Sequence, residues 1–246
     1  MLGNKIMRDI EELIKEDKKY KNAVIQQKFK SKKNTVAYAT LDDKPRVLKW
    51  FVPGKKKQMD TEVSVIKKGS SKLNIPIIHD IDKKNYVLIM NYIVGENLCD
   101  IINDKEISFN EKQRLIVLLS QWFFDFHNHF KQNEKIFIHG DPSLRNFIFS
   151  DRIWGVDFEE SRIGKPVEDV AGMCASVLST EPMFNSEKFT LCNIFIENYL
   201  TLAPGRIIDT DNEISYFLLE KIQWRPNDEE ILRKYSKLIR EKGLNI

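Results

Sequence analysis

Residues 137–160, FIHGDPSLRNFIFSDRIWGVDFEE, constrain what this chain can fold into more than any other stretch. Short apolar runs separate Asp141, Asn146 and Asp157, and residues 150–152 are typical of a hairpin turn. A loop followed by a hairpin brings these three polar side chains to one edge. Two carboxylates and one amide oxygen are hard ligands, so the set suits Mg²⁺ better than zinc or iron.

The order of these residues resembles the catalytic and metal loops of kinases. Protein kinases place an Asn five residues after the Asp of His-Arg-Asp, and Asp-Phe-Gly follows later. Here His139-Gly140-Asp141 stands five residues before Asn146, and Asp157-Phe158-Glu159 follows. The His-Gly-Asp form resembles the aminoglycoside phosphotransferase and choline kinase group, and also some small archaeal-type atypical protein kinases. The alternative is an ordinary hairpin in which the two aspartates are turn and cap residues.

The resemblance implies a role for each of these polar residues. Asp141 would be the base that orients the attacking hydroxyl, while Asn146 and Asp157 would hold Mg²⁺ against the phosphates of ATP. It also implies an α+β, bilobal protein-kinase-like fold. We expect a small antiparallel-sheet lobe that binds the nucleotide in residues 1–92. A mainly helical lobe with the catalytic and metal loops would occupy residues 93–246.

The first lobe is expected to open with a short amphipathic helix and an antiparallel meander. Extended segments are predicted over residues 23–29, 34–41 and 46–52. By resemblance, Lys49 in VLKWF takes the place of the kinase VAIK lysine, which contacts the α and β phosphates. A helix predicted from Asp60 to residue 73 carries Glu62, which the resemblance pairs with Lys49. The alternatives are a solvent-facing strand lysine and an acid that only complements the helix dipole.

Two further segments relate to nucleotide binding. Strands are predicted over residues 77–82 and 86–90, and the resemblance places the adenine against the backbone near Asn91 and Ile93. The turn at residues 30–34, KSKKN, has no glycine, unlike the Gly-rich loop of protein kinases. Its lysines would either offset phosphate charge or form a solvated turn, and the sequence leaves both interpretations open.

The predicted second lobe is built on a long helix. Ser108 and Glu111 form a capping-box pattern, and an apolar stripe follows to about Gln132. His127 and His129, near its end, are expected to cap or pack. Further helices are predicted from residue 170 onward.

The segment after Asp157 departs from the protein-kinase pattern. It contains no long activation segment, and Glu159 replaces the usual glycine. Asp169 matches the second Asp of an Asp-Pro-x-x-Asp-Leu-Ala step in the phosphotransferase group. It is expected to accept hydrogen bonds from the catalytic-loop backbone.

Net charge, apolar runs and cysteine usage indicate which partners and which cellular compartment to expect. Lys plus Arg is 39 and Asp plus Glu is 36, so a net charge of +3 without a basic stripe does not favour nucleic acid. No apolar run is long enough for a membrane span, and the N-terminal stretch lacks the apolar core of a signal peptide. Cys99, Cys174 and Cys192 are isolated, which favours buried free thiols and a cytoplasmic protein.

Together these features predict an ATP- and Mg²⁺-dependent phosphotransferase that acts on an alcohol group. A small-molecule acceptor is the first hypothesis. Glu159, Glu160 and Glu168 could make the entrance acidic and suit a cationic alcohol. An atypical protein serine/threonine kinase, with a protein hydroxyl as acceptor, is the alternative. A catalytically silent nucleotide-binding scaffold is the third.

Overall fold

The computed structural model describes residues 10–29 and 33–245. The start of the predicted N-terminal helix and most of the lysine-rich turn lie outside these residues. The chain forms two compact units. One runs to Ser71 and resumes over Ile75–Val94, and the other contains Lys72–Asn74 and continues from Gly95. The assignment of residues 1–92 to nucleotide binding and 93–246 to catalysis remains a prediction.

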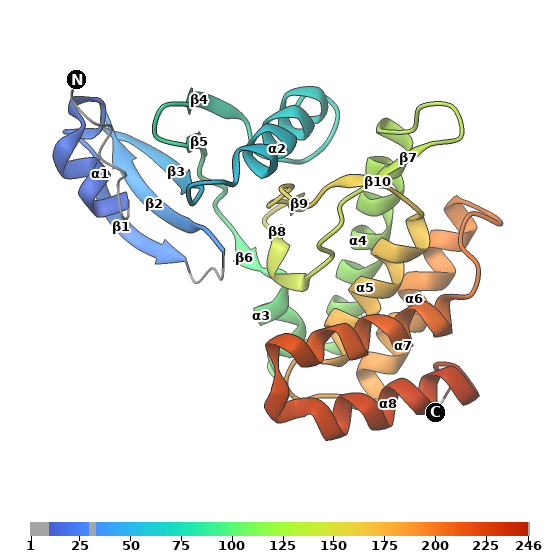
Figure 1. Cartoon of the computed structure of the whole chain (residues 1–246). Helices are drawn as coiled ribbons and strands as arrows, with labels where there is room; N and C mark the ends of the chain where they lie inside the picture. The colour runs from blue at the N-terminus through green and yellow to red at the C-terminus, as the bar shows by residue number, and fades with distance from the viewer. Residues whose placement is uncertain (1–9, 30–32, 246) are drawn as a thin grey trace. The chain divides into compact units, whose positions relative to one another are not determined.

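The first unit contains a five-stranded antiparallel sheet in the order β1-β2-β3-β5-β4 (Figure 1). Its strands are β1 (Val24–Phe29), β2 (Thr35–Leu41), β3 (Lys44–Trp50), β4 (Ile78–Asp82) and β5 (Val87–Asn91). The predicted meander is therefore present, with strand ends shifted by one or two residues. In β3, Lys49 pairs with Val36 on one side and Leu88 on the other. Because side chains alternate along a strand, Leu48 and Trp50 face the opposite side of the sheet from Lys49.

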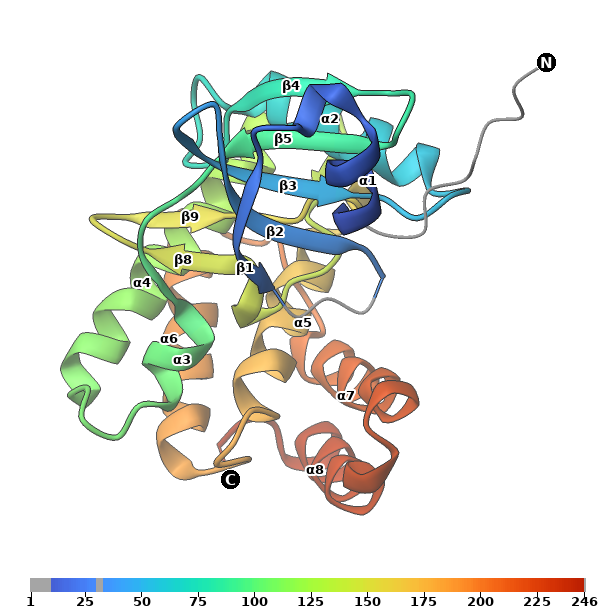
Figure 2. The ribbon, with the colours of Figure 1, turned by 90° about the vertical axis from the view of Figure 1, so that its left-hand side faces the viewer.

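Helices cover both faces of this sheet. Helix α1 (Ile10–Glu16) and the short helix η1 (Lys18–Tyr20) pack on the face that carries Leu48 and Trp50. Helix α2 (Lys56–Gly69) lies on the other face, which carries Lys49 (Figure 2). The Lys49 side chain is thereby enclosed between the sheet and α2.

Helix α2 starts earlier than the predicted Asp60, at Lys56. Asp60 lies inside the helix, where its carboxylate pairs with the Lys56 ammonium group one turn before it. The helix instead follows a turn at Gly54, whose φ is 93°. The earlier start buries Met59 against the unit and puts Glu62 in the second turn, where it is also buried.

The second unit is mainly helical, with short strands that carry the loops (Figure 1). Its first elements are β6 (Glu96–Asn97), α3 (Leu98–Asn103), α4 (Phe109–His129), β7 (Ile136–Ile138), η2 (Leu144–Asn146), β8 (Phe147–Phe149), β9 (Ile153–Gly155) and β10 (Arg162–Gly164). It continues with α5 (Pro166–Leu178), α6 (Ser186–Leu202), α7 (Thr210–Glu220), η3 (Lys221–Trp224), η4 (Pro226–Asp228) and α8 (Glu229–Lys242). Strand β8 pairs with β9 and with β6, and β10 pairs with β7. Antiparallel sheet in the first unit and helices in the second confirm the predicted fold class.

Helix α4 begins as predicted. The Ser108 hydroxyl oxygen accepts a hydrogen bond from the Glu111 N–H at 3.3 Å, which satisfies one of the donors exposed at a helix start. The Glu111 carboxylate bonds Arg114 instead of returning to the cap, so the reciprocal half of the capping box is replaced by an ion pair. The helix ends at His129, short of the predicted Gln132.

Aromatic side chains on α4 pack against the hairpin and the segment that follows it. Trp122 stacks on Phe126 with ring centroids 5.2 Å apart, and Phe126 stacks on Phe158 at 5.8 Å. The Trp122 indole N–H and the Gly155 N–H both donate to the carbonyl oxygen of Asn74, at 3.2 and 3.0 Å. The hairpin and the segment that follows it are thus anchored on the long helix.

The three cysteines are free and buried, as expected. Among the described residues, no helix combines the length and the apolar character that crossing a membrane requires.

Replacing Phe126 with alanine tests the aromatic cluster. We expect the free energy of unfolding to fall by about 3–5 kcal/mol, because a fully buried ring that stacks on two others leaves a cavity. Urea denaturation followed by fluorescence measures the change. Val117→Ala, on the exposed side of the same helix, is the control and should change stability by about 0.5 kcal/mol or less. Equal losses in both variants would contradict the assigned core.

Candidate active site

The loop between β7 and η2 carries the His-Gly-Asp sequence, and its glycine is required by geometry. Gly140 has a φ of 83°, a conformation that side chains with a Cβ rarely adopt. A Cβ atom at this position would also lie 2.2 Å from the carbonyl oxygen of Glu160. The loop can therefore lie against the segment after β9 only if residue 140 is glycine.

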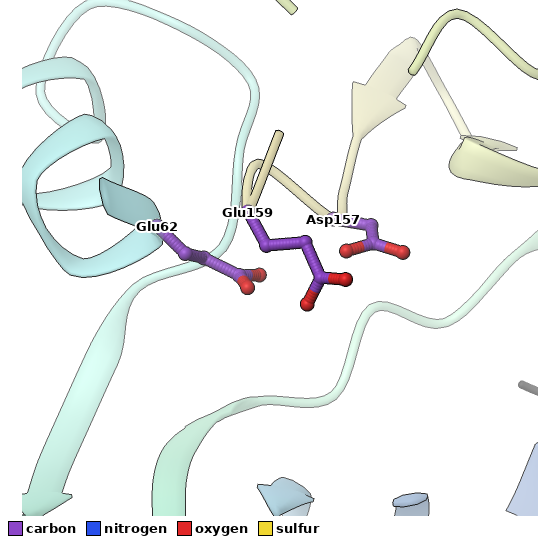
Figure 3. Close-up of side chains that lie close together, drawn as sticks. All are labelled: Glu62, Asp157 and Glu159. Carbon is purple, nitrogen blue, oxygen red and sulfur yellow. The ribbon is translucent and has the colours of Figure 1, made fainter. Parts of the chain in front are cut away.

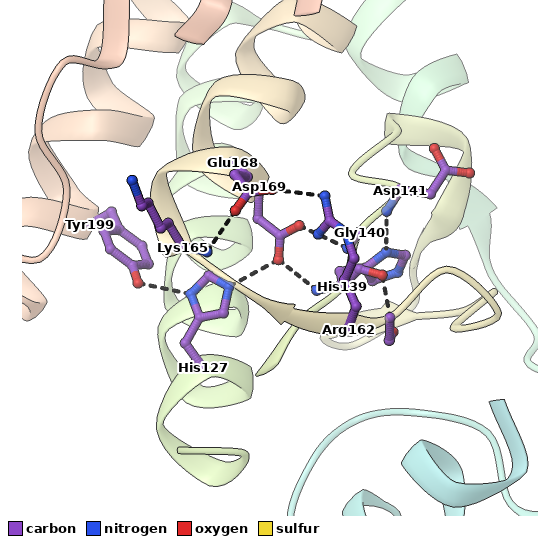
Figure 4. Close-up of polar contacts among 10 residues, drawn as sticks. His127, His139, Gly140, Asp141, Arg162, Lys165, Glu168, Asp169 and Tyr199 are labelled. Carbon is purple, nitrogen blue, oxygen red and sulfur yellow. Dashed lines mark hydrogen bonds and ion pairs between the residues drawn. The ribbon is translucent and has the colours of Figure 1, made fainter. Parts of the chain in front are cut away.

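A buried carboxylate on α5 holds this loop (Figure 4). Asp169 accepts the His139 N–H at 2.7 Å on Oδ2 and the Gly140 N–H at 3.0 Å on Oδ1. His127, on α4, lies with Nε2 2.9 Å from the same Oδ2. The role expected for Asp169 is thus confirmed by its contacts. His127, expected to cap or pack, is buried, and its ring also hydrogen-bonds the Asp169 carboxylate.

The environment of Asp169 favours its charged form. Burial acts to raise the pKa of this carboxyl. The hydrogen bond and electrostatic attraction from His127, the nearby His139 and the Gly140 N–H outweigh burial, so the net pKa lies below the usual value. The carboxylate is consequently ionised at neutral pH and acts only as an acceptor.

Four hydrogen bonds form a closed ring around the predicted catalytic residues. The Asn146 Nδ2 donates to the Asp141 carbonyl at 2.9 Å, and the Val156 N–H donates to the Asn146 carbonyl at 2.9 Å. The His139 Nε2 lies 3.1 Å from the Val156 carbonyl, and the Asp141 N–H donates to the His139 Nδ1 at 3.3 Å. In these contacts the His139 Nδ1 accepts a hydrogen bond from the Asp141 N–H, and the Nε2 faces the Val156 carbonyl.

The ring orients two of the predicted site residues. Because Asn146 uses its amide nitrogen on the Asp141 carbonyl, its Oδ1 atom is directed away from that bond. The Asp141 side chain is exposed, and its carboxylate points away from the bonded cluster (Figure 4). The chain thereby presents one amide oxygen and one carboxylate from a rigid loop. The linking role of His139 was not predicted, although the residue stands in the motif.

The residue after Val156 supplies a second carboxylate. Asp157 has a φ of 66°, which is uncommon for a residue with a side chain and often marks a functional site. Glu159, two residues later, has a carboxylate oxygen within 4.8 Å of one from Asp157 (Figure 3). Carboxylate oxygens are donors that Mg²⁺ prefers, so Asp157 and Glu159 fit a hard divalent cation, and the Asn146 amide oxygen is a donor of the same hard type. From the sequence, Glu159 was predicted only as a departure from Asp-Phe-Gly and as part of an acidic entrance, not as a metal ligand.

In the first unit, Lys49 and Glu62 form the predicted ion pair. The Lys49 Nζ lies 2.5 Å from the Glu62 Oε2. Only 3% of Lys49 and 1% of Glu62 is exposed to solvent. Glu62 projects from the second turn of α2 (Figure 3). The alternatives of a solvent-facing Lys49 and of a Glu62 that only complements the helix dipole are therefore both wrong.

Asn91 and Ile93, predicted near the adenine, lie at and just beyond the end of β5. The Asn91 N–H donates to the Ile77 carbonyl at 3.1 Å, and its Oδ1 accepts the Ile77 N–H at 2.6 Å. Any contact between the Asn91 backbone and an adenine must therefore use the carbonyl oxygen. The role of both residues remains a prediction.

Stability should depend on pH through Asp169. Asp169→Asn is expected to lower the free energy of unfolding at pH 7 by about 3 kcal/mol, because charge-assisted hydrogen bonds are lost. Since the folded-state pKa lies below the unfolded value of about 3.9, the wild-type advantage is complete above that value. It disappears as the pH falls through the folded-state pKa, which urea titrations from pH 7 to about pH 3 would detect.

Asp211→Asn is the control with the opposite sign. Burial, followed by the nearby Asp209, raises the pKa of Asp211. The wild type should therefore gain stability relative to this variant as the pH falls, whereas it loses stability relative to Asp169→Asn. The same pH trend in both comparisons would contradict the assignment.

Comparison with known proteins supports this interpretation of the loop region. The model of the phosphotransferase enzyme family matches residues 96–188. The matched segment contains Asp141 and Asn146 of the loop after β7, Asp157 after the hairpin and the buried Asp169. A search of curated proteins gave no match.

Three solved structures are similar over most of the chain. A choline/ethanolamine kinase family protein from Mesorhizobium loti has a TM-score of 0.58 at 13% identity, covering 89% of this chain and 88% of its own. A putative aminoglycoside phosphotransferase from Ralstonia eutropha has a TM-score of 0.57 at 12% identity, covering 90% and 91%. A choline kinase from Cryptosporidium parvum has a TM-score of 0.53 at 14% identity, covering 94% and 93%.

At these identities the solved structures establish the fold, and the family match adds the enzyme class for the segment that carries the loops. The chain is therefore a phosphotransferase of the protein-kinase-like fold, similar to the aminoglycoside phosphotransferase and choline kinase group.

Proposed function

We propose that the chain transfers the γ-phosphoryl group of ATP, with Mg²⁺, to the hydroxyl group of a small molecule. The hydrogen-bonded ring through His139, Asp141, Asn146 and Val156 carries this proposal. Phosphoryl transfer depends on positioning and charge neutralisation more than on covalent chemistry. A loop fixed at four points, with an exposed carboxylate at its tip, meets the first need.

Each site residue has a defined part in this proposal. Asp141 would orient the acceptor hydroxyl and accept its proton. Asn146 and Asp157, with Glu159 beside them, would hold Mg²⁺, which neutralises charge on phosphate oxygens when bound. Lys49, fixed by Glu62, would contact the phosphates, and the backbone at Asn91 and Ile93 would contact the adenine.

The segment after Asp157 supports a small acceptor. Strand β10 pairs with β7 through Arg162–Gly164 and Ile136–Ile138. The Ser161 hydroxyl donates to the His139 carbonyl at 3.0 Å, which ties the same segment to the catalytic loop. A short, folded segment offers little chain for gripping an extended protein substrate. By name, the similar solved structures are kinases of choline or ethanolamine and of aminoglycosides, all small molecules.

The hypothesis of a cationic acceptor loses part of its basis. Glu168 accepts hydrogen bonds from the Arg162 guanidinium at 2.7 Å and from the Lys165 N–H at 2.7 Å. Its charge is therefore balanced locally, and Glu159 is buried, so neither residue supports the predicted acidic entrance. For this reason the proposal specifies an alcohol and does not specify its charge.

A transfer assay tests the proposal. The purified chain would be incubated with Mg²⁺ and γ-labelled ATP over panels of amino sugars, amino alcohols and proteins. Label on a small alcohol supports the proposal. Label on proteins alone would assign an atypical protein kinase, and nucleotide binding without any transfer would assign a silent scaffold.

Asp141→Asn should separate binding from transfer. We expect kcat to fall by about 10²–10⁴-fold, because the group that accepts the hydroxyl proton is lost. The Kd for Mg-ATP should stay within about twofold, since the role concerns the acceptor. Asp151→Asn, an exposed acid in the hairpin turn, is the matched control and should leave both constants unchanged. Full transfer by the Asp141 variant would exclude it as the base.

Lys49→Met should instead weaken nucleotide binding. We expect the Kd for Mg-ATP to rise by about tenfold or more, because a charge-assisted contact to phosphate is worth about 1.5–3 kcal/mol. Titration calorimetry measures it, and Lys44→Met, at the exposed start of the same strand, is the control. Equal affinity in the two variants would remove Lys49 from the phosphate site.

A further inference from the structure

The two units of the chain have opposite net charges. The first unit contains 20 Lys or Arg residues and 11 Asp or Glu residues, so its net charge is +9. The second unit contains 19 and 25 of them, so its net charge is −6. The total of +3, from which nucleic acid was not expected as a partner, averages this difference. The first unit therefore has to be considered by itself.

Lysines of the first unit gather on the exposed side of helix α2. Lys56 and Lys57 lie in its first turn, Lys67 and Lys68 lie in its last turn, and all four side chains are exposed. Eleven residues, close to three helical turns, separate Lys56 from Lys67 and Lys57 from Lys68. The two pairs therefore lie on the same side of the helix, about 16 Å apart along its axis. We call these four residues the lysine face.

The lysine face keeps a net positive charge. Between the two pairs, the exposed residues Asp60 and Ser64 have short side chains. Asp60 is the one acid on this side of the helix, and its carboxylate pairs with Lys56. Lys57 and Lys67 form no ion pair with any acid in residues 10–29 and 33–245. At least two ammonium groups are thus available to a partner.

Helix stability explains only one of the two lysine pairs. The N-terminal end of a helix dipole is positive, so it disfavours Lys56 and Lys57, whereas the C-terminal end favours Lys67 and Lys68. The first turn contains no acidic residue that would offset this cost. Lysines at the N-terminal end of α2 therefore favour a role in binding over a role in stability.

The chemistry of the lysine face indicates the class of its partner. Protein interfaces are depleted in lysine and enriched in aromatic residues, and helices that lie on membranes insert apolar side chains. Among the described residues of the first unit, the exposed large apolar side chains all lie outside α2, namely Val24, Phe29, Ile77 and Val94. The face also lacks the aromatic rings on which unpaired bases stack. A partner with regularly spaced phosphates and paired bases fits these features best.

We propose that the lysine face binds the phosphate backbone of a nucleic-acid duplex without reading its sequence. Lysine ammonium groups act as point charges toward phosphates and displace the counterions of the duplex. The major groove of B-form DNA is about 12 Å wide, so flexible lysine side chains at the two ends of α2 can contact phosphates on both sides of a groove. The proposal goes beyond the proposed function and does not rest on it.

Fluorescence anisotropy with short labelled DNA and RNA duplexes tests the proposal on the full chain. We expect the Kd to rise by about 10²-fold between about 50 and 200 mM salt, because four phosphate contacts give a slope of about −3.6 in log K against log salt. Duplexes of unrelated sequence, and DNA and RNA, should bind within about threefold of one another, since phosphate contacts contain no sequence information.

A double substitution assigns the binding to α2. Lys57→Gln combined with Lys67→Gln should raise the Kd for a duplex by at least about tenfold at 50 mM salt and reduce the salt slope by about 2. Lys83→Gln combined with Lys84→Gln is the matched control. It removes the same charge from an exposed turn of the same unit and should change the Kd by less than about threefold.

Asp60→Asn tests the proposal in the opposite direction. Removing the acid within the face releases Lys56, so we expect duplex binding to become about threefold to tenfold tighter. A misfolded variant cannot produce such a gain. The Kd for Mg-ATP should stay within about twofold in every variant, which separates duplex binding from an effect on a nucleotide site.

Three results would overturn the proposal. One is a wild-type Kd above about 1 mM for every duplex at 50 mM salt. Another is equal weakening by the double substitutions in α2 and in the turn. The third is tighter binding to single strands, or to vesicles of anionic lipid, than to duplexes. If the wild type transfers no phosphate, the proposed function fails and these Kd values still decide the proposal.

Discussion

The buried charge of Asp169 is the interaction on which the His-Gly-Asp loop of the second unit depends. A carboxylate without solvent contact is costly unless donors satisfy it. Here the donors are His127 from α4 and the backbone of His139 and Gly140. The same hydrogen bonds therefore satisfy the charge and fix the backbone of the His-Gly-Asp loop.

The first unit also contains buried charges that are satisfied by a partner, here the Lys49–Glu62 ion pair. Lys49 and Glu62 are both buried, and their ion pair lies between a strand and a helix on the same face of the sheet. Hydrophobic residues of similar size would often be as stable as a buried ion pair. Retaining charged groups at such positions therefore favours a role in binding or catalysis over a role in stability.

Local patterns predicted much of this structure. Alternation and turn residues identified the strands, Ser108 identified the start of α4, and the loop motif identified Asp141, Asn146 and Asp157 as candidates. The start of α2 was misplaced, because an interior acid was interpreted as a cap. The link between His127 and Tyr199, 72 positions apart, has no local signature and depends on how α4 and α6 pack.

The pairing of β10 with β7 has a consequence for regulation. Many kinases are switched on when phosphorylation orders a mobile segment near the catalytic loop. In this chain the corresponding residues are already ordered as a strand, and Ser161 is buried with its hydroxyl bonded to the His139 carbonyl. Under the proposed function, this segment would therefore need no separate ordering step before turnover.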